Sequence, residues 1–249
     1  MTLVFCHYIN HTLIIVTDSL ITGHSAQKPK CASFPAKGVV IAWWGNYDLE
    51  PKALRDNPLT CQAGDREYAA NNLIGDKLPQ TEGVSPSFPD VFLKALNATP
   101  HVHNGNTGKA GLLMGVVIRK SIHAFVFEAK GGRGSWGLTD SCGMRDWPQV
   151  FGDTDSLNKM LEAQNPKEDL SDLTGSKTYG EFASKASRWI WQTERFQKGN
   201  ARVPTVGLPA YGLELRIDGT IEGPTPIHDY ALCPNHGPQF DRSRQRLAG

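Results

Sequence analysis

The chain has little of what marks several large classes of protein. Its 249 residues include only five cysteines, and no two of them form a Cys-x-x-Cys pair. An odd number of widely spaced cysteines argues against a disulfide framework and is typical of reduced thiols. The N-terminus also lacks the basic segment and the small-residue cleavage site of a secretory signal peptide. We therefore expect a cytoplasmic protein.

Neither charge nor hydrophobicity is concentrated in one segment. Twenty-six Lys and Arg residues against twenty-five Asp and Glu give a net charge of +1, which argues against a surface that follows nucleic-acid phosphates. The longest apolar run, residues 112–118, is interrupted by Gly115 and is too short to cross a bilayer. We expect neither nucleic acid nor a membrane as a partner.

Metal and phosphate motifs are incomplete. His101 and His103, or Cys233 and His236, would supply two ligands each, and two ligands do not close a zinc site. The segment GNTGKA at 105–110 lacks the glycine spacing and the final Ser or Thr of a phosphate-binding loop. We therefore expect no metal and no cofactor.

What the sequence does contain is paired strands. Residues 2–17 are rich in β-branched and aromatic side chains on both sides of Ile-Asn-His, which predicts an antiparallel hairpin. Further strands are predicted at 37–45, 111–118, 121–128 and 149–152, and on both sides of the Asp-Gly turn at 218–219.

Helices are predicted between the strand pairs. Residues 89–97 and 155–163 have helical patterns, and Thr178 with Glu181 forms a capping box before an apolar stripe at helical spacing. This order of elements favours an α+β domain in which antiparallel sheets form a sandwich covered by helices. We expect a single domain over 1–224 and a polar C-terminal extension over 225–249.

The N-terminal residues point to chemistry. Removal of Met1 would leave Thr2 with its hydroxyl beside a free α-amino group, whose ordinary pKa is about 7.7 to 8.0. That amine can act as the base for its own hydroxyl. The reaction also needs a cation near the amine, a carboxylate that holds the cation, and a backbone N–H that stabilises the oxyanion.

Residues 2–23, TLVFCHYINHTLIIVTDSLITG, resemble the start of the proteasome β-subunit superfamily of N-terminal nucleophile (Ntn) hydrolases, of the bacterial proteasome homologue type. In that family a nucleophilic Thr begins the first strand and an Asp-Ser pair ends the returning strand, as Thr2 and the pair 18–19 do here. The stretch 28–46, KPKCASFPAKGVVIAWWGN, resembles the family's lysine strand and its oxyanion-hole glycine. The resemblance covers the N-terminal fifth of the chain well and 178–223 loosely.

This resemblance implies a four-layer αββα Ntn-hydrolase sandwich and a threonine protease or amidohydrolase. In these roles Thr2 attacks an amide carbonyl, Lys30 tunes the amine and Asp18 anchors Lys30. It also implies a peptide or amide substrate and a homo-oligomeric ring, and it leaves the identity of any unfoldase partner open. The residues it assigns to catalysis are Thr2, Asp18, Lys30 and Gly45, with Ser19 and Thr22 in support.

Alternatives stay open at this point. Lys28 or Lys37 could take the place of Lys30, because the chain before Lys30 is shorter than in the family. The late Asp and Ser of the family have no clear counterpart, and Thr205 is the substitute that the sequence offers. The tryptophans at 43–44 either narrow the pocket or pack in the core. The alternative functions are a catalytically silent ring scaffold and a small-amide Ntn acylase.

Overall fold

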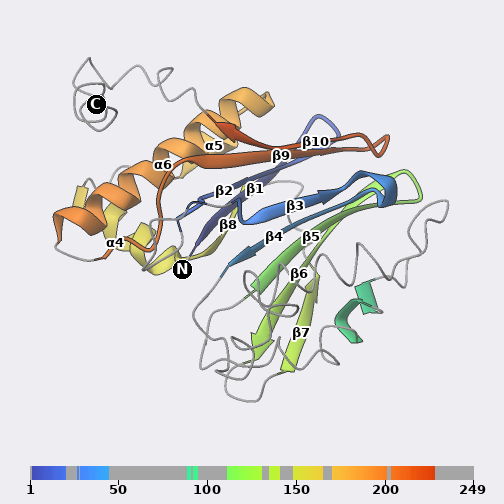
Figure 1. Ribbon diagram of the computed structural model, residues 1–249. Helices are drawn as coiled ribbons and strands as arrows, with labels where there is room; N and C mark the ends of the chain where they lie inside the picture. The colour runs from blue at the N-terminus through green and yellow to red at the C-terminus, as the bar shows by residue number, and fades with distance from the viewer. Residues whose placement is uncertain are drawn as a thin grey trace.

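Two antiparallel sheets make up most of the described chain. The computed structural model describes residues 2–20, 27, 29–44, 89–90, 92–94, 111–130, 135–140, 148–164, 170–200 and 203–227. The first sheet has the strand order β10-β9-β2-β1-β8 and the second the order β3-β4-β5-β6-β7. Figure 1 shows the two sheets stacked on each other, with the helices α4, α5 and α6 beside the first.

The first sheet is built on the predicted N-terminal hairpin. Its turn at Asn10 and His11 has positive φ at both residues (48° and 63°), as expected of a tight two-residue turn. The outer strand β10 continues past the predicted domain boundary at 224, and the division at that point stays a prediction. The strands are β1 (Leu3–Ile9), β2 (Thr12–Thr17), β8 (Gln149–Gly152), β9 (Ala210–Arg216) and β10 (Ile221–Ile227).

The second sheet contains two strands that the sequence did not predict, β3 and β7. The expected strand at 37–45 begins later, because Pro35 starts a 3-10 turn (η1, Pro35–Lys37) that ends at Gly38 with a φ of 61°. Among the described residues the strand then ends at Trp44. The strands are β3 (Cys31–Phe34), β4 (Val39–Trp44), β5 (Gly111–Ile118), β6 (Ser121–Lys130) and β7 (Ser135–Asp140).

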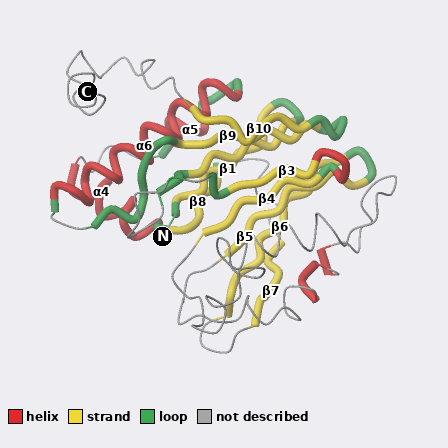
Figure 2. Tube along the Cα trace, in the orientation of Figure 1, coloured by secondary structure: helices red, strands yellow, loops and turns green. Residues whose placement is uncertain are grey.

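Three helices lie together at the first sheet, as Figure 2 shows in red. They are α4 (Thr154–Gln164), α5 (Ser171–Thr174) and α6 (Tyr179–Gly199). The predicted cap of the long helix is confirmed, since the Thr178 side chain accepts a hydrogen bond from the N–H of Glu181. Among the described residues no helix is long and apolar enough to cross a membrane.

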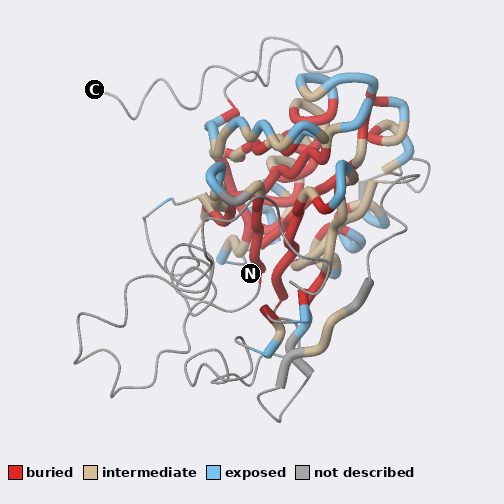
Figure 3. Tube along the Cα trace, turned by 90° about the vertical axis from the view of Figure 1, so that its right-hand side faces the viewer, coloured by how far each residue is buried: buried red, intermediate tan, exposed pale blue. Residues whose placement is uncertain are grey.

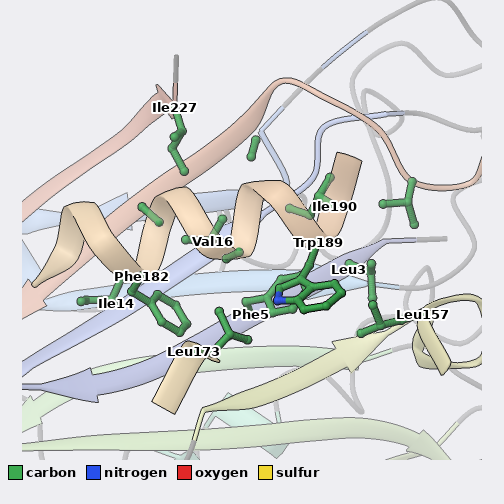
Figure 4. Close-up of a cluster of buried hydrophobic side chains, with 14 of the residues drawn as sticks. Leu3, Phe5, Ile14, Val16, Leu157, Leu173, Phe182, Trp189, Ile190 and Ile227 are labelled. Carbon is green, nitrogen blue, oxygen red and sulfur yellow. The ribbon is translucent and has the colours of Figure 1, made fainter. Parts of the chain in front are cut away.

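The apolar side chains of α6 face the first sheet. Phe182, Trp189 and Ile190 of the helix are buried against side chains of β1 and β2, as Figure 4 shows. The alternate side chains of β1, such as Val4, point the other way and pack between the two sheets with Val40 and others. Both faces of β1 and β2 are therefore covered, and all but one residue of each strand is buried. Figure 3 shows in red the buried residues of the described chain.

The outer face of the second sheet carries a separate apolar cluster. Phe92, from the helical residues 92–94, contacts Phe127 of β6 with ring centroids 5.1 Å apart. Trp43 belongs to this cluster and Trp44 to the one between the sheets, so both tryptophans pack in the core. The described helical residues on this face are few, and the four-layer αββα Ntn-hydrolase sandwich stays a prediction.

Candidate active site

Thr2 lies where the first strand begins and is held from the neighbouring strand β8. It is 2% exposed, and its carbonyl accepts a hydrogen bond of 2.8 Å from the N–H of Asp153, just after β8. The next residue, Leu3, pairs with Gly152. Because β1 lies between β2 and β8 in the sheet, the start of the chain has a paired strand on each side.

Gly152 lets β8 approach Thr2 closely. A Cβ atom at this position would lie 1.8 Å from the Thr2 carbonyl oxygen, and the φ of Gly152 is 94°. An L side chain is therefore excluded by both space and backbone conformation. The glycine at the end of β8 is part of what fixes the position of Thr2.

Asp18 follows β2 and returns to the start of β1. Its Oδ1 accepts a hydrogen bond of 2.9 Å from the N–H of Leu3, the residue after Thr2. Its Oδ2 accepts from Lys30 Nζ at 3.0 Å, from the N–H of Leu20 at 3.2 Å and from the N–H of Gly207 at 3.4 Å. The hairpin therefore brings this carboxylate to the first strand, as its place in the sequence predicts.

Lys30 is the lysine that the structure places against Asp18. Both side chains are buried, and the carbonyl of Lys30 accepts a hydrogen bond of 3.0 Å from the N–H of Trp43. Among the alternatives, Lys28 lies outside the described residues, and nothing is described of the Lys37 side chain. An ion pair at this depth is not solvated by water, so each charge depends on the other.

The buried environment sets the protonation behaviour of this pair. Burial raises the pKa of Asp18 above its ordinary value of 3.8, whereas the positive charge of Lys30 and the hydrogen bonds from Lys30 and Leu3 oppose that rise. Removal of the cation would take away the largest of the effects that oppose this rise in the pKa of Asp18. The charge of Asp18 is thus coupled to the presence of Lys30.

Of the two predicted supporting residues and the predicted oxyanion-hole glycine, the structure describes only Ser19. Ser19 is buried, and its N–H donates a hydrogen bond of 3.2 Å to the carbonyl of Gly207. Within the described part of the chain, no hydrogen-bond partner faces the Ser19 hydroxyl. Thr22 and Gly45 lie outside the described residues, as do the paired candidates His101 with His103 and Cys233 with His236. The described residues contain no group of three side chains that could hold a metal ion.

A second buried carboxylate, Asp153, lies on the other side of Thr2, and the sequence did not single it out. Its Oδ1 accepts a hydrogen bond of 3.3 Å from the N–H of Ser156 and so caps α4. Its Oδ2 accepts from the Thr205 hydroxyl at 2.5 Å and from Gln197 Nε2 at 3.3 Å. The sequence pattern that could have pointed to Asp153 is its place three residues before Ser156 at the start of a helix. This pattern predicts a helix cap and no further role.

The segment 203–209 contacts both carboxylates. Thr205 is bonded to Asp153, and Gly207 is bonded to Asp18 and Ser19. The substitute that the sequence offered, Thr205, therefore lies in the network around Asp153. Gln197, in the last turns of α6, had no sequence signal because its role depends on a contact across the fold.

Comparison with known proteins finds similar structures and no similar sequences. No family model and no curated protein matches the chain. A Gly-1 mutant of Anbu from Hyphomicrobium sp. strain MC1 matches with a TM-score of 0.55 and 13% identity over 92% of this chain and 88% of that chain. Anbu from Yersinia bercovieri, described as an ancestral beta-subunit, matches with a TM-score of 0.51 and 12% identity over 92% and 89%.

These findings correct the family assignment made from the sequence. The resemblance of residues 2–23 predicted a member of the proteasome β-subunit superfamily of Ntn hydrolases, of the bacterial proteasome homologue type. At 12–13% identity the likeness extends to the fold alone, which the chain shares with the two Anbu structures. It does not make the chain a member of that superfamily, and it carries over no residue roles.

Proposed function

We propose that this protein is a threonine-type peptidase or amidohydrolase that cleaves peptide or related amide bonds through Thr2 once Met1 has been removed. One observation carries the proposal: the Asp18–Lys30 ion pair is buried at the first peptide unit after Thr2. A charged pair is costly to bury. A cation and a carboxylate at this place are what an N-terminal threonine needs for catalysis.

The proposed reaction has two steps. In the first, the Thr2 hydroxyl adds to the amide carbonyl while the Thr2 α-amine takes its proton, and that proton then passes to the departing amine as the C–N bond breaks. The product is an ester between Thr2 and the acyl group. In the second step the same amine takes a proton from water, whose oxygen adds to the ester and releases the acid and free Thr2.

The surrounding groups have separate tasks in this proposal. The charge of Lys30 disfavours protonation of the nearby α-amine, which keeps the amine available as a base at neutral pH. Asp18 holds Lys30 and the N–H of Leu3. Gly45, outside the described residues, is proposed to donate its N–H to the oxyanion. A homo-oligomeric ring and a cytoplasmic location are kept as parts of the proposal, the latter supported by the buried, reduced thiols of Cys6 and Cys31.

The first test is the intact mass of the purified protein. A peptide epoxyketone reacts with both the hydroxyl and the amine of an N-terminal threonine and closes a ring on it. We expect the mass of a chain without Met1, followed by one stoichiometric adduct. Thr2→Ala should give no adduct, and Thr12→Ala, a change at a partly buried threonine that starts β2, should give the same adduct as the unaltered protein.

The outcomes separate the candidate functions. A chain that keeps Met1, or that loses Met1 and gives no adduct, would contradict the proposal. The silent ring scaffold would then be favoured, and the 2% exposure of Thr2 in the chain that carries Met1 is the observation in its favour. If the adduct forms, a panel of peptides and small acyl amides measures which substrate class is cleaved.

A further inference from the structure

Gln197 of α6 makes hydrogen bonds with both ends of its side-chain amide. Its Oε1 accepts from the N–H of Thr205 at 2.9 Å, and its Nε2 donates to the Thr205 hydroxyl at 2.7 Å. The same Nε2 donates to the hydroxyl of Ser156 at 3.0 Å and lies 3.3 Å from Asp153 Oδ2. The reversed amide would put its oxygen against the Asp153 carboxylate and its NH₂ against an N–H, so the partners fix the orientation.

The groups that Gln197 holds belong to the two segments on either side of Thr2. Asp153 donates its own N–H to the Thr2 carbonyl at 2.8 Å. Thr205 lies two residues before Gly207, whose N–H and carbonyl contact Asp18 and Ser19. A displacement at Gln197 would therefore reach Thr2 through Asp153, and Asp18 through the segment 203–209.

The helix that carries Gln197 is well fixed. Its first turn is capped by Thr178, and Phe182, Trp189 and Ile190 are buried against the sheet. Gln197 itself is 3% exposed, at the far end of the helix from the cap. A long capped helix is a rigid element on which the position of a site can depend.

We infer that Gln197 is a positioning residue of the candidate active site, which fixes the Asp153 segment and the segment 203–209 and through them the backbone of Thr2. The catalytic consequence of this inference rests on the proposed function, whereas the positioning itself does not. The amide is required because it donates and accepts at once. A methionine of similar size does neither, and an ionised glutamate accepts only.

Hydrogen exchange tests the positioning without reference to activity. In Gln197→Met the N–H groups of Asp153 and Gly207 should exchange with deuterium about 10-fold faster at matched global stability, since a buried hydrogen bond to each segment is lost. The control is Thr193→Val, one turn earlier on the same helix, where a buried hydroxyl bonded to the Trp189 carbonyl is removed. Unchanged exchange in Gln197→Met, or equal changes in both variants, would overturn the inference.

Kinetics tests the consequence in the full chain. If the unaltered protein cleaves a peptide substrate, Gln197→Met should lower kcat about 10- to 100-fold with little change in KM, because the nucleophile is misplaced while the substrate contacts remain. An unreactive unaltered protein would count against the proposed function, and the exchange result would still decide the inference. A reactive protein whose kcat is the same in Gln197→Met would refute the catalytic consequence.

Gln197→Glu gives a readout that a merely structural role would not change. A protonated carboxyl can donate one hydrogen bond, whereas the ionised form repels Asp153 and donates none. The rate of this variant, divided by that of the unaltered protein at the same pH, should therefore rise as the pH falls. A ratio that is independent of pH, with normal exchange at Asp153, would contradict the assigned role of the amide.

Discussion

Two buried aspartates lie on opposite sides of Thr2, and the structure satisfies them in different ways. Asp18 is paired with the charge of Lys30 and also accepts backbone N–H groups. Asp153 accepts from neutral groups, namely the Thr205 hydroxyl, the Gln197 amide and a backbone N–H. Of these two aspartates, only Asp18 forms an ion pair with a described residue.

This difference shows what each carboxylate can contribute. An ion pair brings a positive charge to the site, and that charge can act on a titratable amine. A carboxylate held by neutral donors brings no cation to the site. Because hydrogen bonds are directional, however, its donors fix the position and orientation of the carboxylate. In the proposed reaction, Asp18 therefore serves the electrostatics of the site and Asp153 its geometry.

The largest expected effect comes from Lys30→Met. It leaves the buried Asp18 without its cation, which should cost about 3–5 kcal/mol in the free energy of unfolding, measured with urea. Adduct formation at Thr2 should be lost as well. The double variant Asp18→Asn with Lys30→Met should recover most of the stability, because no unpaired charge is left, but none of the reactivity.

The pH dependence of Lys30→Met sharpens this prediction. Without the cation, burial raises the pKa of Asp18 further above 3.8, so the folded state binds a proton that the unfolded state has released. The cost of the substitution should therefore be smallest below pH 3.8 and should grow as the pH rises through the raised pKa. A cost that is the same at pH 4 and pH 7 would contradict the buried pair.

Gly152→Ala is expected to disturb the Asp153 side of the site and to leave the Asp18 side unchanged. The left-handed backbone alone should cost about 1–3 kcal/mol, and the clash with the Thr2 carbonyl should displace Thr2 and slow adduct formation. Thermal unfolding and adduct kinetics measure the two effects. Gly180→Ala on α6, where a Cβ meets nothing within 4 Å, is the control, which should not destabilise the protein and should leave adduct formation unchanged.

Asp153→Ala should cost less than the loss of Lys30. It leaves the Thr205 hydroxyl and the Gln197 amide without an acceptor, which should lower the free energy of unfolding by about 1–3 kcal/mol. Because no ion pair is broken, the loss should not change between low and high salt. A loss that salt reduces markedly would mean that a cation also serves Asp153.

The smallest effect is expected for Lys198→Ala. Lys198 Nζ lies 2.6 Å from Glu194 Oε1 one turn apart on α6, but its side chain is 57% exposed. Such a pair should contribute less than about 1 kcal/mol. Glu194 still accepts from the N–H of Leu208, so adduct formation should be unchanged. A marked loss of reactivity would place this exposed pair among the groups that position the segment 203–209.

The sequence predicted the parts of the site that a local hairpin brings together. Thr2 comes directly before β1 and Asp18 directly after β2, and the antiparallel pairing of these two strands follows from the pattern of apolar residues. The sequence assigned Lys30 but left Lys28 and Lys37 open, because the partner of the lysine depends on how the chain crosses from one sheet to the other. The roles of Gly45 and Thr22 stay predictions.

The remainder of the site depends on contacts between distant segments. Asp153 and Gln197 meet because α6 lies across the first sheet, and no periodicity encodes that register. For a similar reason the short strands β3 and β7 were missed: CASF and SWGLTD become strands by pairing with β4 and β6. Local pattern predicted the hairpins, whereas the order of strands within each sheet needed the structure.

The place of β9 in the first sheet has a consequence for the timing of assembly during translation. β9 lies next to β2, and Gly207 just before it contacts Asp18 across 189 positions of the chain. While the ribosome has made only the first 200 residues, β2 has no strand on that side and Asp18 lacks one of its donors. A nascent chain therefore carries Thr2 without its completed surroundings, and the site matures only after nearly the whole domain has been synthesised.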